Sequence, residues 1–543
     1  MKELDAIIIG AGFSGLYMLH KLRKLGLNVK VVERGEDIGG TWFWNRYPGA
    51  RCDIDSIFYS YTFSEEIYKE WNWSSRYAEQ PEILEYINYV ADKLDLKKDI
   101  LLNHNVENAV YDENKSKWKV NLNNKIECEC KFLIAATGAL SNASIPKLEG
   151  LENFKGEYYH TGNWPKEGVN FKGKKVGILG TGSTGIQVIP RVAKEAEELY
   201  VFQRTAQYTT PANNFELTKE YIDDIKTNFN SLCDKRENSF NGTDLENITF
   251  SFYSDTPKKR LERLEEAWSK GGLYFAFTYK ELLVDSKVSL EIGEFIKTKI
   301  ESIVESDNKI QLLKPNYYFG ARRPILDSGY YETFNRENVH LVDIKSNPIK
   351  CINDVGISLK ENDYPLDIII LATGYDAVTG ALFGINPKGK NGISLKDHWQ
   401  DGAFVKTYLG LMCNNFPNLF IVTGPESPSV LSNMVASIEQ HVEWISDFIE
   451  YIEKNNIVEV EPTEEEENKW HETVKEMAKD TLFNKVDSWY TAANIPGKKR
   501  PDGFLMYVGG LNNYRKICKD IANQGYIGFN LKKIQTSNIK EAV

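Results

Sequence analysis

The alternation of apolar runs and helical patterns at the start of the chain predicts a parallel α/β unit. Residues 2–10 lead into an apolar run, residues 14–25 have helical periodicity, and residues 27–33 form a second apolar run. A buried strand, a helix and another buried strand within about 30 residues are typical of a doubly wound parallel sheet. We therefore expect such a sheet in this part of the chain.

The same succession of patterns recurs from residue 174. Residues 174–180 are apolar, a helical pattern extends to about residue 196, and residues 199–203 are apolar again. Two similar apolar runs that end in a turn, 132–138 and 368–374, would carry the chain from one unit toward the other. The repetition predicts an α/β fold with two Rossmann-like dinucleotide-binding domains.

The composition changes between residues 211 and 319, where charged and aromatic residues recur at helical spacing without a convincing strand pattern. We interpret residues 211–319 as a helical insertion in the second domain, and residues 437–482 are also expected to be helical. The first domain is expected to comprise residues 1–141 and 377–543, and the second residues 142–376.

The charge balance narrows the range of partners. The 543 residues include 66 Lys and Arg against 77 Asp and Glu, a net charge of −11, and such a surface disfavours nucleic-acid binding. No apolar stretch reaches the roughly 18 residues of a membrane span, and the first residues lack a signal-peptide pattern. The seven scattered cysteines predict neither disulfides nor a metal site. We expect a cytoplasmic monomer or weak dimer without nucleic-acid or membrane partners.

The first candidate site is a glycine-rich turn between the first predicted strand and helix. Gly10, Gly12 and Gly15 allow close approach of a pyrophosphate, which the N-terminus of the helix can bind. Glu33 ends the next predicted strand, where a carboxylate accepts hydrogen bonds from ribose hydroxyls and repels a 2′-phosphate. The combination predicts a site for FAD or NAD, and the alternative is an ordinary strand-to-helix turn.

The second glycine-rich turn, with Gly180, Gly182 and Gly185, is followed by a basic residue in place of the acid. Arg204 stands after the next predicted strand, where a guanidinium can bind a 2′-phosphate, so this site is expected to prefer NADPH over NADH. One acidic and one basic nucleotide site imply hydride transfer from NADPH to a flavin. Disulfide reductases share this layout, but no redox pair of cysteines follows the first unit.

Further motifs carry a resemblance to a known family. Residues 154–165 (FKGEYYHTGNWP) match the pattern FxGxxxHxxxWP, and residues 39–53 (GGTWFWNRYPGARCD), 322–324 (RRP) and 488–490 (SWY) stand in the expected order. Along nearly its whole length the chain resembles the type I Baeyer–Villiger monooxygenases, among them the phenylacetone and cyclohexanone monooxygenases. Related flavin-containing monooxygenases and N-hydroxylases carry a similar motif without the terminal Trp-Pro.

The resemblance implies that a ketone, dioxygen and NADPH react to give an ester or lactone through a peroxyflavin on bound FAD. Arg323 matches the family's catalytic arginine, whose charge stabilises anionic oxygen and is retained at any relevant pH. Asp53 matches the aspartate that holds this arginine. His160 and Trp164 match linker positions, for which we expect a structural role.

The resemblance also assigns cofactor contacts, with FAD in the domain of residues 1–141 and 377–543 and NADPH in that of residues 142–376. The positions expected to contact FAD are Ser14, Glu33, Thr41, Trp42, Phe43, Trp44, Asp53, Tyr59, Val106 and Met434. The positions expected to contact NADPH are Arg51, Cys52, Asp53, Thr181, Gly182, Ser183, Thr184, Gly185, Ile186, Gln187, Arg204, Thr205, Arg322 and Arg323, with Trp489 in a loop over the nicotinamide.

Two other functions stay open at this point. A flavin-containing monooxygenase that oxidises sulfides or amines shares the fold, although the Trp-Pro ending and the Arg323–Asp53 pair favour ketone oxidation. A non-catalytic nucleotide-binding protein is disfavoured by the intact glycine motifs.

Two departures from the family pattern leave the substrate range open. Glu426 in place of glycine is expected to alter the size or polarity of the substrate pocket, and Ala492 in place of glycine to stiffen the gating loop.

Overall fold

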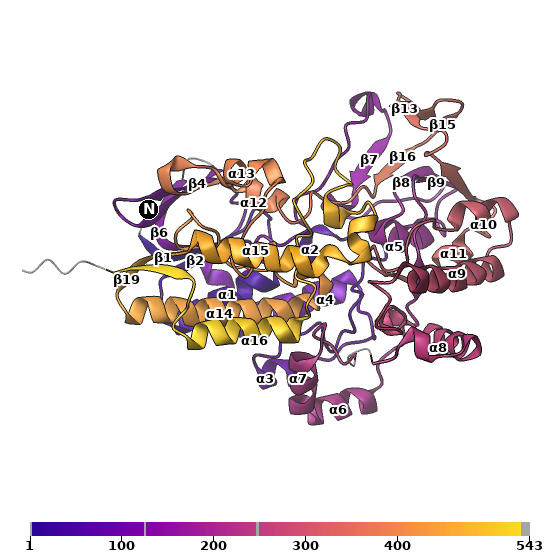
Figure 1. Cartoon of the computed structure of the whole chain (residues 1–543). Coiled ribbons are helices and arrows are strands. Elements are labelled where there is room, and N and C mark those ends of the chain that lie inside the picture. Colours follow the sequence, from indigo (N-terminus) through magenta and orange to yellow (C-terminus); the bar gives the residue numbers. More distant parts are fainter. Residues whose placement is uncertain (1–2, 124–125, 246–248, 534–543) are drawn as a thin grey trace, which may run out of the picture.

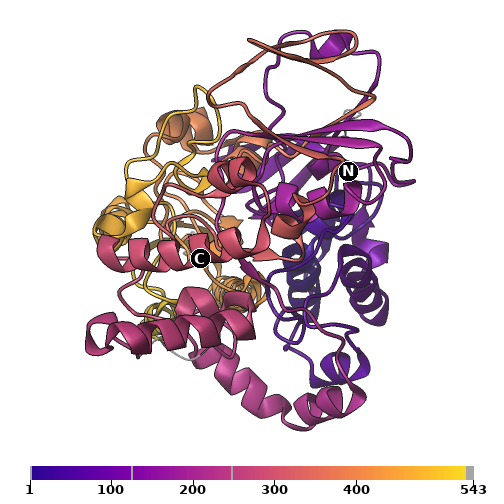
Figure 2. The ribbon, with the colours of Figure 1, turned by 90° about the vertical axis from the view of Figure 1, so that its right-hand side faces the viewer.

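The computed structural model describes residues 3–123, 126–245 and 249–533. Residues 534–543 of the expected first domain and residues 246–248 of the expected insertion therefore lie outside the described residues. Figure 1 shows two α/β halves side by side, and Figure 2 shows the same ribbon from the side of the second half.

An eight-stranded sheet forms the core of the first half. Ile7, Ile8 and Ile134 in its centre have no exposed surface, which explains the uninterrupted apolar runs in the sequence. The helices α1 (Phe13–Lys24) and α14 (Met434–Lys454) pack against each other beside this sheet. Across the sheet the strands are β17 (Pro387–Lys388), β4 (Val106–Asp112), β5 (Lys117–Leu122), β6 (Ile126–Ala135), β1 (Leu4–Ile9), β2 (Val29–Val32) and β3 (Ile100–Leu101), with β18 (Leu419–Ile421) paired to β6.

The second half is built on a five-stranded sheet in which every pairing is parallel. Its strands, in order across the sheet, are β12 (Val339–Asp343), β9 (Glu198–Gln203), β8 (Lys175–Leu179), β16 (Ile368–Leu371) and β7 (Glu157–His160). The helix α5 (Ser183–Val192) follows β8 as α1 follows β1. Two strand–turn–helix units of this kind confirm the predicted α/β fold class.

The chain passes from one large sheet to the other and back, and these two crossings lie side by side. It leaves the first sheet after β6 through residues 136–144 and returns after β16 through residues 372–378. The N–H of Ser144 donates to the carbonyl of Gly374 (2.9 Å), and the hydroxyl of Thr373 donates to the carbonyl of Ser144 (2.7 Å). The crossings thus form a short paired ribbon between the two sheets.

A helical segment joins β10 (Thr209–Pro211) to β11 (Ile325–Asp327), two short strands that pair in parallel. Figure 1 shows α8 and α9 of this segment with the second half, whereas α6 and α7 lie below the first half near α3 (Glu65–Glu70). The segment therefore reaches from one half to the other. Its helices are α6 (Lys219–Thr227), α7 (Phe229–Asn238), α8 (Pro257–Lys270), α9 (Ser286–Ile303) and α10 (Asp307–Leu313).

The tail contains a strand that the sequence pattern did not reveal. Between α14 and α15 (Glu464–Lys479), β19 (Ile457–Pro462) pairs antiparallel with β20 (Phe529–Lys533). The expectation of helix throughout residues 437–482 is therefore wrong at the strand. The partner of β19 lies some way along the chain, so no local pattern announces the pairing.

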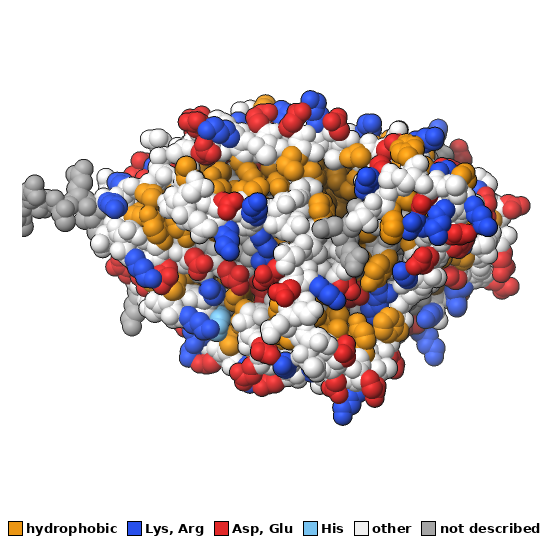
Figure 3. Space-filling model, turned by 60° about the horizontal axis from the view of Figure 1, so that its bottom comes forward, with side chains coloured by type: hydrophobic (Ala, Val, Ile, Leu, Met, Phe, Trp, Pro, Cys, Tyr) orange, Lys and Arg blue, Asp and Glu red, His pale blue; other side chains and the backbone are white. Residues whose placement is uncertain are grey.

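The remaining helices and one small sheet lie outside the two large sheets, and several of these helices pack against other helices. They are α2 (Thr41–Trp44), α4 (Gln80–Lys93), α11 (Tyr330–Thr333), α12 (Gly380–Gly384), α13 (Leu395–His398), α16 (Leu511–Asn523) and the small antiparallel sheet β13 (Ile349–Ile352), β14 (Gly356–Leu359) and β15 (Asp363–Pro365). Among the described residues, no helix has the length and apolar character of a membrane span. All seven cysteines are described, and none forms a disulfide. On the face in Figure 3, acidic and basic side chains are intermixed.

Candidate active site

The two glycine-rich turns have the same backbone geometry. Gly10 and Gly180 adopt φ +105° and +107°. A Cβ on them would lie 2.6 Å and 2.4 Å from the carbonyl oxygens of Ala136 and Ala372, at the start of the two crossings. No side chain caps α1 or α5, so their first N–H groups are available to an anion. A Cβ on Gly182 would meet nothing within 4 Å, which leaves room for a pyrophosphate.

An acidic residue stands beside the first turn. Glu33 directly follows β2, is buried, and accepts hydrogen bonds from the N–H groups of Ala11 (2.9 Å) and Gly35 (2.7 Å). Each oxygen of this fixed carboxylate has a further lone pair for a ribose hydroxyl. Gly15 keeps α1 close to the turn, since a Cβ there would lie 1.8 Å from the carbonyl oxygen of Gly10. These residues fit the adenosine side of FAD.

Two arginines stand beside the second turn. Arg204 follows β9 and is exposed, and Arg322 is half-buried with its guanidinium 4.4 Å from the Tyr317 ring centroid. The Nε of Arg322 has no partner, and among the described residues neither arginine forms an ion pair. Burial lowers the pKa of Arg322, and the positive charge of Arg204 lowers it further. Two neighbouring cations that form no ion pair fit the 2′-phosphate of NADPH.

The other expected NADPH contacts around this turn differ in exposure. Ser183 is exposed and Thr184 half-buried, so both hydroxyls can reach a ligand. Ile186 is 1% exposed in the core, and its N–H donates to the carbonyl of Gly182 (2.9 Å), so the structure does not bring it to the surface of the site. The hydroxyl of Thr181 donates to the carbonyl of Thr205 (3.0 Å) and fixes the turn against the loop after β9.

Gln187 and Arg51 meet between the two halves. The Gln187 amide donates to the carbonyl of Arg51 (3.1 Å) and accepts from the Tyr47 hydroxyl (2.8 Å). The Arg51 guanidinium is paired with Glu79, and Cys52 is buried. These side chains are therefore engaged in holding residues 39–53 against α5.

The expected flavin-side residues gather around α2. Trp42 and Phe43 are buried, whereas Thr41 is exposed and Trp44 half-buried. The Trp42 indole donates to the Tyr59 hydroxyl (3.1 Å). Val106 and Met434 complete this set and differ in exposure. Met434 is half-buried at the start of α14, whereas Val106 is only 2% exposed in the core. Val106 therefore offers almost no surface to a cofactor.

Asp53 and Arg323 form a bidentate ion pair although 270 residues separate them. The Arg323 Nε and Nη2 lie 2.7 Å and 2.8 Å from the two Asp53 carboxylate oxygens, and Nη1 donates to the carbonyl of Val430 (2.8 Å). Burial alone would lower the pKa of Arg323, but the Asp53 carboxylate outweighs it, and the pKa is raised. The guanidinium is a permanent cation in a fixed orientation.

The surroundings of this cation are apolar and aromatic. The phenol of Tyr490 lies against Arg323, and burial raises the pKa of Tyr490. The ring of Trp489 lies 4.3 Å from that of Tyr490, and Val430, Leu431 and Met434 belong to the same apolar cluster. The sequence analysis selected Trp489 but missed Tyr490 and the Val430 carbonyl. Tyr490 stands in the Ser-Trp-Tyr motif and could have been found there, whereas a backbone carbonyl leaves no signal in a sequence.

His160 and Trp164 are packed into the second half. His160 is 5% exposed at the end of β7, and its Nδ1 accepts from the N–H of Gly162 (3.0 Å). Burial lowers the pKa of His160. Trp164 is 4% exposed and packs against Tyr159 and Phe171. Both residues therefore serve the packing of the linker.

The two departures from the family pattern share one backbone feature. Glu426 and Ala492 adopt φ +68° and +57°, the left-handed region that glycine occupies most easily. The Glu426 carboxylate is 1% exposed and accepts from the N–H of Thr407 (2.8 Å) and contacts His471 Nδ1 (2.6 Å). The Glu426 side chain is therefore committed to a buried network, and its effect on the size or polarity of the substrate pocket stays a prediction.

The site combines two nucleotide-binding turns, with an acid at one and two cations at the other, and a fixed arginine between apolar residues. Together these features define a flavoprotein oxidoreductase. The family described as "FMO-like: Flavin-binding monooxygenase-like" matches residues 4–213. Cyclohexanone 1,2-monooxygenase of Acinetobacter sp is 41% identical over 99% of this chain and 98% of its own. A phenazine N-monooxygenase of Lysobacter antibioticus is 39% identical over 99% and 98%.

Solved structures agree with these relatives. The crystal structure of cyclohexanone monooxygenase from Rhodococcus sp. Phi1 bound to NADP⁺ superposes with a TM-score of 0.95 at 40% identity, covering 98% of this chain and 99% of that one. The chain belongs to the type I Baeyer–Villiger monooxygenases. It is an FAD- and NADPH-dependent enzyme that converts ketones into esters or lactones, as the sequence motifs predict.

Proposed function

We propose that residues 1–141 and 377–543 hold FAD, and that residues 142–376 hold NADPH. This division is supported by the open helix N-termini at both glycine-rich turns. It is also supported by Glu33 beside the first turn and Arg204 beside the second. When bound, NADPH supplies the hydride, and FAD supplies the chemistry that activates dioxygen. The chain's own residues have to bind and orient the ketone and stabilise charge.

In this proposal Arg323 is the catalytic residue. Its fixed positive charge stabilises the negative charge that develops on the carbonyl oxygen when the carbonyl is attacked. Asp53 and the Val430 carbonyl hold three of its N–H groups, so the orientation is set before the substrate arrives. The observation that carries the proposal is this oriented cation among apolar side chains, an environment that favours an uncharged ketone. The protein is proposed to act in the cytoplasm as a monomer or weak dimer.

The similarity to a phenazine N-monooxygenase supports a second candidate, oxidation of a nitrogen or sulfur atom. The test measures NADPH consumption and product mass with cyclic, aryl and linear ketones, and with an amine and a sulfide. We expect esters or lactones with one added oxygen atom, and poor activity with NADH. Oxygenation of the amine alone, with only hydrogen peroxide from every ketone, would replace the proposal by the second candidate.

A further inference from the structure

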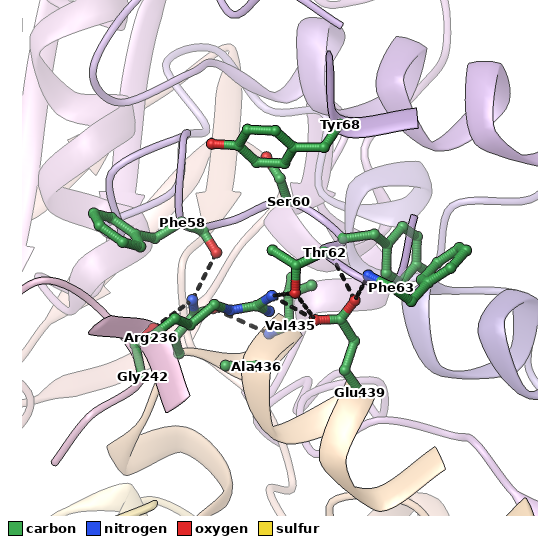
Figure 4. Close-up of polar contacts among 12 residues, drawn as sticks. Phe58, Ser60, Thr62, Phe63, Tyr68, Arg236, Gly242, Val435, Ala436 and Glu439 are labelled. Atoms are coloured by element: carbon green, nitrogen blue, oxygen red, sulfur yellow. Dashed lines mark hydrogen bonds and ion pairs between the residues drawn. The ribbon is translucent and has the colours of Figure 1, made fainter. Parts of the chain in front are cut away.

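Among the contacts that the helical segment between β10 and β11 makes with the first half is one buried arginine, Arg236 (Figure 4). Arg236 in α7 is 1% exposed, and its Nη1 contacts both the Glu439 carboxylate on α14 and the Thr62 hydroxyl. Glu439 in turn accepts from the N–H groups of Thr62 (2.7 Å) and Phe63 (2.9 Å). One buried ion pair therefore joins α7, α14 and the segment around Thr62.

Asn433 forms a second connection between the same three parts through three hydrogen bonds. Its side-chain amide donates to the carbonyls of Phe58 (2.7 Å) and Gly242 (3.0 Å), and its N–H donates to the carbonyl of Asn241 (2.7 Å). Gly242 packs so tightly there that a Cβ would lie 2.9 Å from the Ala436 side chain. The junction leaves little freedom for any of the three segments to shift alone.

These segments also carry both groups that hold Arg323. Asp53 lies five positions before Phe58, and the Val430 carbonyl lies three positions before Asn433. The bond from Asn433 to Phe58 closes a ring of contacts that runs through Asp53, Arg323 and Val430. The position of Arg323 thus depends on how firmly the two segments are held together.

We propose that Arg236 is a positioning residue for the oxygenation reaction. It clamps the segments of Asp53 and Val430 to each other and to the helical segment of the second half, and so fixes the guanidinium of Arg323 relative to the substrate. The inference rests on the proposed role of Arg323. It assigns to Arg236 a part in catalysis that needs no contact between Arg236 and the substrate.

The test compares Arg236→Met with Arg260→Met in the purified holoenzymes. Arg260 lies in the same helical segment and pairs with Glu291 (2.7 Å), so its variant loses an ion pair of similar chemistry away from the junction. For Arg236→Met we expect a fall of about tenfold in kcat, because small displacements of a reacting group are costly. We also expect more hydrogen peroxide and less ester per NADPH, with the KM for NADPH within about twofold. For Arg260→Met both product ratio and kcat should stay at the wild-type level.

Thr62→Val keeps the proposal testable if Arg236→Met does not fold. This nearly isosteric change removes the hydroxyl that Arg236 contacts and that donates to Glu439 (2.9 Å), and we expect a smaller change in the same direction. Measurements are made at equal FAD content and well below the melting temperature of each variant. A lower melting temperature with unchanged kcat and ester yield in Arg236→Met, or in Thr62→Val where only that folds, would overturn the proposal. A wild-type enzyme that makes no ester would instead refute the proposed function.

Discussion

Replacement of Arg204 by alanine is expected to remove most of the preference for NADPH over NADH. The side chain is exposed after β9, and among the described residues it forms no ion pair. Its loss therefore breaks no contact that the fold needs. Arg322 stays in place as the second cation of the site.

The size of the effect follows from the contact that is lost. A hydrogen bond to a charged group contributes about 1.5–3 kcal/mol, which corresponds to about 10- to 150-fold in binding. Arg204 is exposed and screened by solvent, so the lower end applies. We expect kcat/KM for NADPH to fall about 10- to 30-fold and that for NADH to change less than about twofold.

The assay is steady-state ketone oxidation with each nucleotide at low and high salt. Arg336→Ala, another exposed arginine of the second half, is the control and should leave both nucleotides unaffected. The wild-type advantage of NADPH should shrink with salt, because a phosphate contact at an exposed site is screened. An equal loss with NADPH and NADH would refute the reasoning, since Arg204 would then support the loop and not the phosphate.

Three further predictions concern the cation, the second turn and the pH dependence of stability. Arg323→Met and Asp53→Asn should each lower ester formation by roughly 10²–10³-fold while the protein keeps its FAD, measured by product mass and the flavin spectrum. Gly182→Ala should fold and bind FAD normally, because its Cβ meets nothing within 4 Å, yet raise the KM for NADPH about tenfold by occupying the approach to the turn. Burial raises the pKa of Asp327 to about 6, so the fold retains a proton that the unfolded chain releases, and stability should fall by up to about 3 kcal/mol between about pH 4 and 6. Melting curves of wild type and Asp327→Asn should show this loss in the wild type alone; parallel pH profiles would contradict it.

The fold could be predicted from the sequence because its main signals are local. The glycine-rich turns, Glu33 and Arg204 each stand within or directly after a strand–helix–strand pattern, and such patterns are set by neighbours in the chain. The strand β19 was missed for the opposite reason, since its pairing with β20 is set by a distant segment.

The same difference between local and distant signals applies to the candidate site. No pattern of spacing could join Asp53 to Arg323, which came together in the sequence only through the resemblance to a family. The Val430 carbonyl is a backbone atom in no motif, and Arg236 looks like any charged residue of an exposed helix until its burial is seen. The direction of the Glu426 side chain likewise depends on His471 and Thr407, which are far from it in sequence but adjacent in the fold.

The paired crossings have a mechanical consequence. Two covalent tethers bonded side by side act as one hinge between the two sheets, and the junction of the helical segment with the first half is a further link that limits rotation about this hinge. Each tether starts at a carbonyl pressed against a nucleotide turn, Ala136 at Gly10 and Ala372 at Gly180. A rotation at the hinge therefore shifts the backbone at both turns. If a nucleotide binds more tightly at one angle between the halves, its binding must in turn favour that angle. We expect the loading of either coenzyme to be coupled in this way to the angle between the halves.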